Sequence, residues 1–356
     1  MKKMKRLAAL LLSAALLTGC AAQGAPKATE APTATAAPTA TAVPDTTKTT
    51  GMGFYFDTVV TVTLYGAPEG MMDEIWAACT RYEKLLSKTI AGSDVSRINA
   101  ANGQTITIDP ETWDILRRAK EISSLSGGAF SVTIAPLTAM WDFTGGTNRM
   151  PADEERIAAL PLVDDSAIVL GDDSTLTRPA GMQIDLGGIA KGYIADKVAE
   201  LVRGRVFGAI LSLGGNVYVV GDKPDGSLNS VGVQDPFSYT GTTLGIVYTK
   251  NNSVVTSGTY ERGFAGPDGT WYHHILDPKT GLPSTSDLVS ATFVMDSSMT
   301  ADALATACIV MGSEQAMTFV REQGWDALFI TRDGKTLASD GFVDKYRYTL
   351  LADLMK

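Results

Sequence analysis

A segment that cannot fold limits where this chain can form a domain. From Ala21 to about Thr49 the sequence consists mainly of Ala, Thr and Pro, with few large apolar side chains. Such a segment buries too little surface to offset the entropy lost on ordering. We therefore predict a flexible tether over residues 20–50 and place all folding in residues 51–356, which is long enough for one large domain or two small ones. Because this part has no second Pro-rich break and no internal repeat, one domain is the simpler interpretation.

The residues before the tether are typical of an export signal. Basic residues at positions 2–6 precede an apolar run, Leu7–Leu17, which is too short to span a bilayer comfortably. The sequence that follows, Leu17-Thr18-Gly19-Cys20, resembles the lipobox of bacterial lipoproteins. This resemblance implies that a signal peptide of residues 1–19 is removed and that Cys20 is lipidated, which would anchor the protein in the membrane at the extracytoplasmic face of the cell. An ordinary signal peptide with an incidental Cys is the alternative.

Charge and cysteine content narrow the functional classes. The formal net charge of −9 argues against a nucleic-acid partner, because phosphate backbones are bound by clustered Lys and Arg. It says little about a phosphate ligand carried by magnesium. Beyond Cys20, only Cys79 and Cys308 remain, and both lie in apolar patterns typical of helices. A disulfide is possible in an exported protein, but two buried thiols are expected, and no Cys or His spacing suggests a zinc site.

Hydrophobic periodicity predicts strands and helices in irregular alternation. Phe54–Tyr65 is rich in β-branched and aromatic residues and is predicted to be a strand. The other predicted strands are Gln183–Leu186, Gly208–Leu213, Asn216–Val220, Leu244–Thr249 and Ser253–Thr256, and the predicted helices are Met71–Leu86, Thr112–Leu125, one after Gly187-Gly188, and one from about Thr300. Without a regular βαβ repeat, this order predicts an α+β domain with a mixed sheet.

Two segments could hold a phosphate and a metal ion. In Asp185–Gly192, two consecutive glycines lie between a predicted strand and a helix start, where backbone N–H groups can face an anion. The alternative is a tight turn followed by a solvent-facing Lys191. In the last clear helix, Asp302 and Thr306 are four residues apart and share a face, so their oxygens suit magnesium. Here the alternative is a helix with an acidic first turn and a Thr bonded back to a carbonyl.

The histidines form a third candidate site. His273 and His274 are the only two in the chain, and Asp277-Pro278 and Gly281 follow them in a predicted turn. A histidine can accept a proton from a hydroxyl at neutral pH. A histidine hydrogen-bonded within a loop is the alternative for both, more strongly so for His273.

Taken together, these segments resemble the ApbE family of FAD:protein FMN transferases, some members of which instead hydrolyse FAD. The resemblance covers nearly all of residues 51–356 and follows the family order. Its seven blocks are Met52-Gly53; Ser93–Asn99; Gly127–Ser131 with Pro136-Leu137 and Trp141; Asp185–Gly192; Ser257-Gly258 with Tyr260–Arg262; His274–Gly281; and Ala301–Thr306. Seven ordered blocks are far more specific than any single one, so they favour the functional interpretation of the glycine turn, Asp302 and Thr306.

The resemblance also implies roles for individual residues. It implies that Mg²⁺ is held by Asp302, Thr306 and the carbonyl of Gly188, with Ala305 adjacent through its backbone. Around FAD, the implied substrate, it places Met52, Ala129, Phe130, Ser131, Asp185, Lys191 and Leu276, several through main-chain atoms. Ser257 is expected near the nucleotide, and His274 matches the histidine of the reaction centre. Two positions depart from the family: Ser131 stands where Asp is frequent, and some members have a flavin-stacking Tyr near the position of Thr89.

The implied reaction transfers FMN from FAD to a Thr or Ser hydroxyl of an exported acceptor flavoprotein and releases AMP. A magnesium-dependent FAD pyrophosphatase that releases FMN and AMP would need the same site and remains an alternative. A lipoprotein that binds FAD without chemistry is a second alternative, although it has no need of a metal beside the pyrophosphate. A solute-binding lipoprotein would fit the tether but would leave the seven blocks unexplained.

Overall fold

The folded part of the chain begins with a β-hairpin of β1 (Lys48–Tyr55) and β2 (Thr58–Tyr65). The single strand predicted over Phe54–Tyr65 is therefore wrong, because the chain reverses direction at Phe56 and Asp57, each with φ of 56°. Such a two-residue turn needs φ > 0 at both central positions and is usually signalled by Asn-Gly or Asp-Gly. Phe-Asp carries no such signal, so the strand propensity on either side concealed the turn.

Because of this hairpin, the domain starts earlier in the sequence than predicted. The computed structural model describes residues 45–143 and 146–354, and all of them belong to one compact unit. Lys48–Thr50 lie inside the predicted tether of residues 20–50 but pair with Thr63–Tyr65 of β2, so the sheet begins before the predicted boundary. The predicted signal peptide, Cys20 and the rest of the tether up to residue 44 lie outside the described residues.

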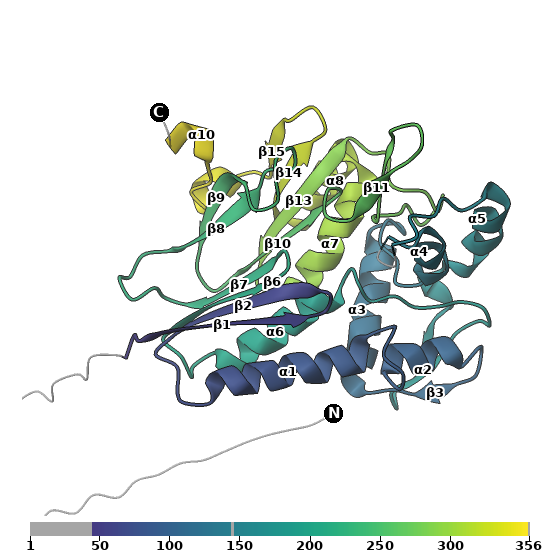
Figure 1. The fold of residues 1–356 in the computed structure, drawn as a ribbon, viewed down its shortest axis with the longest axis horizontal. Helices are drawn as coiled ribbons and strands as arrows, with labels where there is room; N and C mark the ends of the chain where they lie inside the picture. The colour runs from purple at the N-terminus through teal and green to yellow at the C-terminus, as the bar shows by residue number, and fades with distance from the viewer. Residues whose placement is uncertain (1–44, 144–145, 355–356) are drawn as a thin grey trace, which may run out of the picture. The chain divides into compact units, whose positions relative to one another are not determined.

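An eight-stranded sheet forms the frame of the molecule, with β1 at one edge (Figure 1). Its order is β1-β2-β6-β7-β10-β13-β14-β15, where β6 is Gly208–Leu213, β7 Asn216–Gly221, β10 Ser253–Gly258, β13 Leu288–Met295, β14 Asp326–Thr331 and β15 Thr336–Ala338. Each neighbouring pair is antiparallel. The α+β class is confirmed, with the difference that strand directions in this sheet are antiparallel rather than mixed.

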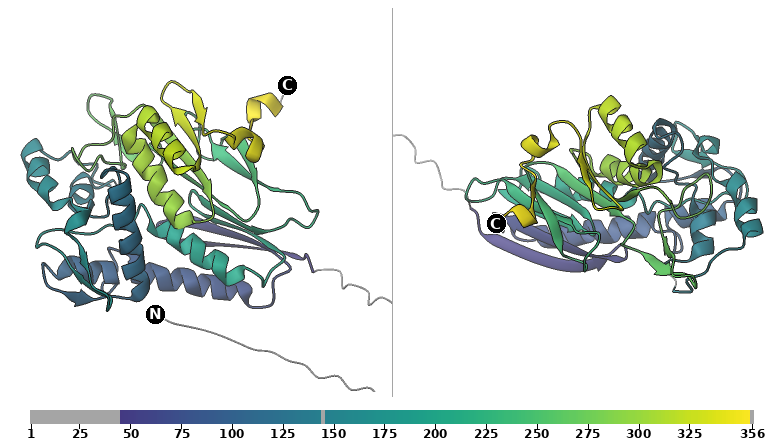
Figure 2. Two further views of the ribbon diagram at one scale, coloured as in Figure 1. Left: turned by 180° about the vertical axis from the view of Figure 1, so that it is seen from behind. Right: turned by 90° about the horizontal axis from the view of Figure 1, so that it is seen from above.

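Helices cover one face of the sheet and bury the largest core (Figure 2). Helices α1, α6, α7 and α8 pack on the strands, and α3 packs on α7. Their bounds are Met71–Leu86 for α1, Pro110–Leu125 for α3, Ala190–Val202 for α6, Ser298–Met311 for α7 and Ser313–Gln323 for α8. The predicted helix over Met71–Leu86 is confirmed in full, because its apolar residues repeat at helical spacing. Cys79 and Cys308 are buried in this core as free thiols, as expected.

A second sheet covers part of the opposite face. It has the order β16-β9-β8, with β8 at Asn229–Gln234, β9 at Thr243–Thr249 and β16 at Thr349–Leu350. Apolar side chains of the two sheets, such as Val219, Val247 and Leu328, form a separate cluster between them. This cluster does not include β1 and β2, whose side chains Met52, Phe54 and Val59 are exposed.

An aromatic cluster of Trp141, Phe143, Phe264 and Tyr272 supports the segment that carries the histidines. Trp141 in α4 (Ala135–Trp141) stacks on Tyr272 in β12 (Trp271–His273), with ring centroids 5.5 Å apart. The Trp141 indole N–H donates to the carbonyl of Gly281 at 2.9 Å. The hairpin partner of β12 is β11 (Gly263–Ala265).

The remaining elements are short. They are α2 (Asp94–Ala100), β3 (Ile106–Thr107), α5 (Asp153–Ala159), β4 (Val169–Leu170), β5 (Thr175–Thr177), α9 (Phe342–Lys345), α10 (Leu351–Leu354) and the 3-10 turns Leu160–Leu162 and Asp165–Ala167. Among them, β3, β5 and β4 form a small sheet of their own. In the part of the chain that the structure describes, none of the helices combines the length and apolar character of a membrane span.

Candidate active site

The candidate site is built where α6 and α7 cross at very close range. Gly192 on α6 allows this approach: a Cβ at that position would lie 2.3 Å from the carbonyl oxygen of Ser298 on α7. The Gly192 N–H donates to Oδ2 of Asp302, one turn further along α7, at 2.9 Å. Because Asp302 is buried, this bond fixes its carboxylate relative to the start of α6.

The chain reaches α6 through an extended segment that is not a strand. The strand predicted over Gln183–Leu186 is wrong, because this backbone pairs with a side chain and a loop instead of a neighbouring strand. The Ile184 N–H donates to Asn99 Oδ1 at 2.7 Å, and Asn99 Nδ2 donates to the Ile184 carbonyl at 2.9 Å. The Asp185 N–H donates to the carbonyl of Val132 at 2.8 Å. Asn99 thus supplies both hydrogen bonds that a neighbouring strand would have given.

The two glycines that follow bring this turn against α7. The Gly187 N–H donates to Asp185 Oδ1 at 2.9 Å, which closes a tight turn. A Cβ on Gly188 would lie 3.1 Å from Cε2 of Phe130 and 3.7 Å from the hydroxyl of Thr306. The absence of a side chain at Gly188 therefore lets the backbone meet the Phe130 ring and the Thr306 hydroxyl together.

The oxygens gathered here fit a magnesium ion. Among the described residues, the Lys191 ammonium is the one cation recorded near Asp302 Oδ1, at 3.7 Å, and a buried carboxylate requires strong compensation for its charge. The Thr306 hydroxyl bonds back to the Asp302 carbonyl at 3.3 Å and retains lone pairs. No group of three or more His, Cys, Asp or Glu in the described residues could form a metal site of its own. One carboxylate, a hydroxyl and a carbonyl match an ion that keeps waters and binds substrate phosphates.

Asp185 and Lys191 are placed around the glycine turn, each with a partner that the sequence did not reveal. Asp185 Oδ2 lies 2.6 Å from Nζ of Lys88 and 3.3 Å from the Thr138 hydroxyl. Lys191 Nζ donates to the Gly187 carbonyl at 3.3 Å in addition to its contact with Asp302. Lys88 is separated from Asp185 by 97 positions, so no local pattern could have indicated this pair.

A buried carboxylate organises the loop of Ala129, Phe130 and Ser131. Asp165 accepts hydrogen bonds from the Ser131 hydroxyl at 2.6 Å and from the N–H and hydroxyl of Thr133 at 3.0 and 2.7 Å. The Ser131 hydroxyl is therefore engaged within the protein, at one of the two positions where the sequence departs from the pattern that the resemblance implies. In this chain the carboxylate beside that position comes from Asp165, which holds the loop that carries Phe130 to Gly188.

His274 is oriented by the backbone of Arg262. The His274 N–H and Nδ1 lie 3.1 and 3.2 Å from the Arg262 carbonyl oxygen. A carbonyl can only accept, so Nδ1 carries the proton in the neutral ring and Nε2 is left as the acceptor. Arg262 also donates to the carbonyl of Asp57 in the β1–β2 turn at 3.4 Å, which ties the histidine segment to the edge of the main sheet.

Burial lowers the pKa of His274 to about 4, and the positive charges of Arg262, His273 and Lys191 act in the same direction. His274 is therefore neutral at physiological pH and able to accept a proton. His273 is buried and its Nε2 lies 3.0 Å from the Ser284 carbonyl, a contact that holds the loop. The structure thus gives the two adjacent histidines different surroundings.

The remaining predicted site residues are Ser257, Ala305, Leu276 and Met52. Ser257 lies near the end of β10, and Ala305 is buried in α7 between Asp302 and Thr306. Leu276 is buried in the aromatic cluster, so only its main chain could contact a ligand. Met52 is 72% exposed on β1, on the face opposite Gly51 and Gly53, which pack against α1. Its assignment to the FAD site stays a prediction.

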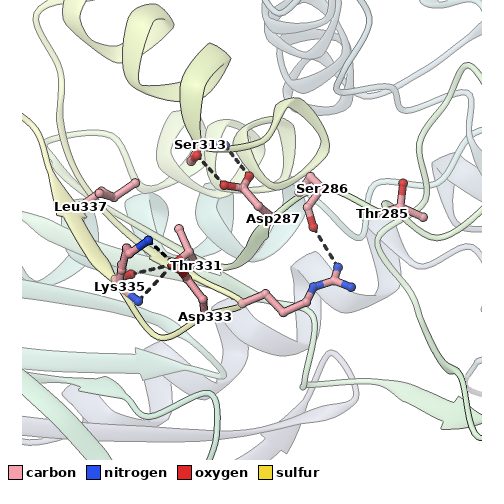
Figure 3. Close-up of a pocket in the computed structure, with 9 residues that line it drawn as sticks. Thr285, Ser286, Asp287, Ser313, Thr331, Asp333, Lys335 and Leu337 are labelled. Carbon is pink, nitrogen blue, oxygen red and sulfur yellow. Dashed lines mark hydrogen bonds and ion pairs between the residues drawn. The ribbon is translucent and has the colours of Figure 1, made fainter.

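A surface pocket at the start of β13 contains none of the predicted site residues (Figure 3). Its lining residues already bond to one another: Asp287 accepts from the N–H and the hydroxyl of Ser313, and the Thr331 hydroxyl accepts from the N–H of Lys335. Geometry therefore favours the α6–α7 crossing, and not this pocket, as the chemical centre.

The fold and the crossing define a class of protein: an α+β domain with a glycine turn suited to phosphate beside a site suited to a hard cation. Comparison with known proteins identifies the family. The model of the ApbE family matches residues 56–329, and the chain belongs to this family, as its sequence blocks predicted. Met52 lies just before the matched residues.

Related proteins resemble this chain both in sequence and in structure. The chain is 35% identical over 295 residues to the FAD:protein FMN transferase of Treponema pallidum (strain Nichols), a match that covers 78% of this chain and 81% of that protein. It is 33% identical over 281 residues to the enzyme of the same name from Klebsiella pneumoniae (strain 342), covering 78% and 87%. The crystal structure of the ApbE protein of Thermotoga maritima is similar with a TM-score of 0.77 at 30% identity, covering 83% of this chain and 98% of that one.

The close crossing at Gly192 gives a testable prediction. Gly192→Ala should lower the free energy of unfolding by about 1–3 kcal/mol, because the new methyl group meets backbone that can only yield by separating α6 and α7. Urea denaturation measures this change. Glu200→Ala, on the exposed side of α6, serves as the control and should change stability by less than about 0.5 kcal/mol. Equal effects of the two substitutions would contradict the proposed tight contact.

Proposed function

We propose that this protein is a magnesium-dependent FAD:protein FMN transferase that attaches FMN to a Thr or Ser hydroxyl of an exported acceptor protein and releases AMP. Membership of the ApbE family and relatives named FAD:protein FMN transferase support the transferase activity. The observation that carries the metal-dependent part is the convergence of Asp302, Thr306 and Gly188 beside Lys191.

In this proposal the oxygens of Asp302 and Thr306 and the carbonyl of Gly188 hold Mg²⁺. The ion would neutralise the charge that develops on the pyrophosphate as it is cleaved. Lys191 adds a second positive charge next to the same position. Together these residues bind and orient the pyrophosphate, which is most of what phosphoryl transfer requires.

His274 accepts the proton in the proposed step. The acceptor hydroxyl oxygen forms a bond to the phosphorus on the FMN side as its proton passes to Nε2 of His274. The bond between that phosphorus and the bridging oxygen breaks, and AMP leaves with the electron pair. Nδ1 keeps its bond to the Arg262 carbonyl, so the ring remains oriented while Nε2 gains the proton. Water in place of the acceptor hydroxyl would give the hydrolase reaction at the same site.

Substitutions at the two halves of the site should have different effects. His274→Asn removes the proton acceptor and should reduce FMN transfer by about 10²–10⁴-fold while FAD binding is retained. Asp302→Ala removes the buried ligand and should abolish transfer together with magnesium-dependent FAD binding. Protein-bound flavin, free FMN and AMP are followed with and without an exported acceptor protein. Equal losses of binding and transfer in His274→Asn would contradict its role, and AMP with free FMN but no bound flavin would favour the hydrolase.

The lowered pKa of His274 predicts the pH dependence. Its neutral, competent form is complete above about pH 5 and is lost only as pH falls through about 4. The value of kcat/KM for FAD reports ionisations of the free enzyme and should therefore show no fall between pH 8 and pH 6 from this residue. Initial rates across that range at fixed ionic strength measure it. A fall with a midpoint near 6.5, the ordinary histidine pKa, would contradict the assignment.

The proposed location follows from the N-terminal sequence. We propose that lipidated Cys20 anchors the enzyme at the extracytoplasmic face of the cell membrane, where its acceptor would also lie. Cys20→Ser should move the protein from the membrane fraction to the soluble fraction. Cys79→Ser serves as the control, because Cys79 is buried in the core. If Cys20→Ser remained in the membrane fraction after salt washing, lipidation at this residue would not be the anchor.

A further inference from the structure

Asp196 on α6 binds the start of the helix that carries Asp302 and Thr306. Its carboxylate accepts a hydrogen bond from the Ser298 N–H at 2.6 Å and from the Met299 N–H at 3.0 Å, which are the first two N–H groups of α7. It also accepts from the Ser297 hydroxyl at 3.2 Å. N–H groups in a first helical turn have no partner within the helix, so a carboxylate there satisfies them and favours the helix dipole.

Ser297 satisfies the other N–H groups at the start of α7. The Ser297 hydroxyl oxygen accepts from the Thr300 N–H at 3.2 Å, and the Ala301 N–H donates to the Ser297 carbonyl at 3.1 Å. Ser297 therefore caps the helix locally, and Asp196 supplies the two acceptors that Ser297 does not. The cap of α7 is thus shared between α7 itself and α6.

The position of Asp196 relates this cap to the candidate metal site. As the chain advances from Gly188 along α6, its contacts move back along α7. Gly188, just before α6, meets Thr306; Gly192 meets Asp302 and Ser298; and Asp196 meets Ser298. Gly188 and Asp196 therefore lie at the two ends of this row of contacts, and Asp302 lies between them. If the start of α7 moved relative to Asp196, Asp302 and Thr306 would shift relative to the Gly188 carbonyl.

We infer that Asp196 is a positioning residue for the magnesium site, which it sets by fixing the start of α7 against α6. This inference rests on the proposed function, because it concerns the ion proposed there. Asp196 makes no contact with the ligands themselves and acts through the helix that carries two of them. Its oxygens face the N–H groups of α7, so a neutral amide would place an N–H₂ donor against one of these N–H groups.

The chain contains a matched control for this effect. Asp287 caps α8 in a similar way: its Oδ1 accepts from the N–H of Ser313, the first residue of that helix, at 2.8 Å, and its Oδ2 accepts from the Ser313 hydroxyl at 2.5 Å (Figure 3). Asp287→Asn therefore removes a carboxylate cap from a neighbouring helix that carries none of the proposed ligands. Both substitutions remove a cap, but only Asp196→Asn should affect the metal.

The experiment measures binding of Mn²⁺, as a probe for Mg²⁺, to the full chain in detergent solution by electron paramagnetic resonance. Asp196→Asn should weaken Mn²⁺ binding by about 10–100-fold, the usual effect of losing a residue that orients metal ligands. Asp287→Asn should bind Mn²⁺ like the wild type, although both variants should unfold at lower temperature. Excess Mg²⁺ should return kcat for FMN transfer in Asp196→Asn to the wild-type value, because only the apparent KM for Mg²⁺ is raised.

Each contrary outcome has a distinct meaning. Wild-type Mn²⁺ affinity in Asp196→Asn, or an equal loss in Asp287→Asn, would overturn the positioning role while leaving the proposed function intact. A kcat that stays low in Asp196→Asn at saturating Mg²⁺ would also overturn it. If the wild-type protein bound no Mn²⁺, the magnesium site of the proposed function would fail with it. Asp196→Ala, which leaves both N–H groups without an acceptor, should weaken Mn²⁺ binding at least as much as Asp196→Asn.

Discussion

The contact between α6 and α7 at Gly192 is the constraint on which the candidate site depends. A helix pair normally keeps its axes 8–10 Å apart, with side chains between them. Here a residue without a side chain lets one backbone meet the other, and the Gly192 N–H reaches the carboxylate of Asp302. That single bond places a buried charge next to the glycine turn. The antiparallel sheet beneath supports both helices and therefore fixes the crossing.

Two parts of the molecule contribute to the site, and they are held by different means. The proposed magnesium ligands lie on or beside helices in the largest core, where packing leaves little freedom. His274 lies on a loop that is held by hydrogen bonds to the Arg262 carbonyl and by the aromatic cluster around Trp141. Arg262 in turn reaches the β1–β2 turn. The ion site is thus set by helix packing, whereas the proton acceptor is set by a loop.

Sequence patterns predicted those features that depend on neighbouring residues. The helix at Met71–Leu86 follows from its apolar spacing, and the shared face of Asp302 and Thr306 follows from their separation of four. The family resemblance added the rest of the candidate set. What the sequence did not reveal depends on contacts between distant segments or on unusual backbone. Asn99 takes the place of a strand beside Ile184, and Phe56-Asp57 forms a hairpin turn without glycine.

The same distinction explains why the sequence analysis missed the carboxylates of Asp165 and Asp196 and the partner of Asp185. Asp165, Asp185 and Asp196 each bind groups that are far away along the chain, and no periodicity marks a carboxylate as a partner for a remote N–H. Asp165 also lies beside a position where the sequence departs from the pattern that the resemblance implies. Ser131 lacks the carboxylate that is frequent there, and Asp165 places one within 2.6 Å of its hydroxyl.

A low pKa at His274 is compatible with the proposed transfer. Phosphoryl transfer proceeds with little bond formation to the attacking oxygen at its transition state, so positioning and charge neutralisation supply most of the acceleration. The hydroxyl proton then becomes acidic late, when a weak base suffices. A strongly basic histidine would be protonated in part of the enzyme at neutral pH and would not accept a proton. Burial, together with the nearby cations, keeps His274 neutral, and in the proposed function the same cations would favour a pyrophosphate beside it. In this proposal the same charges therefore favour both substrate binding and a neutral histidine.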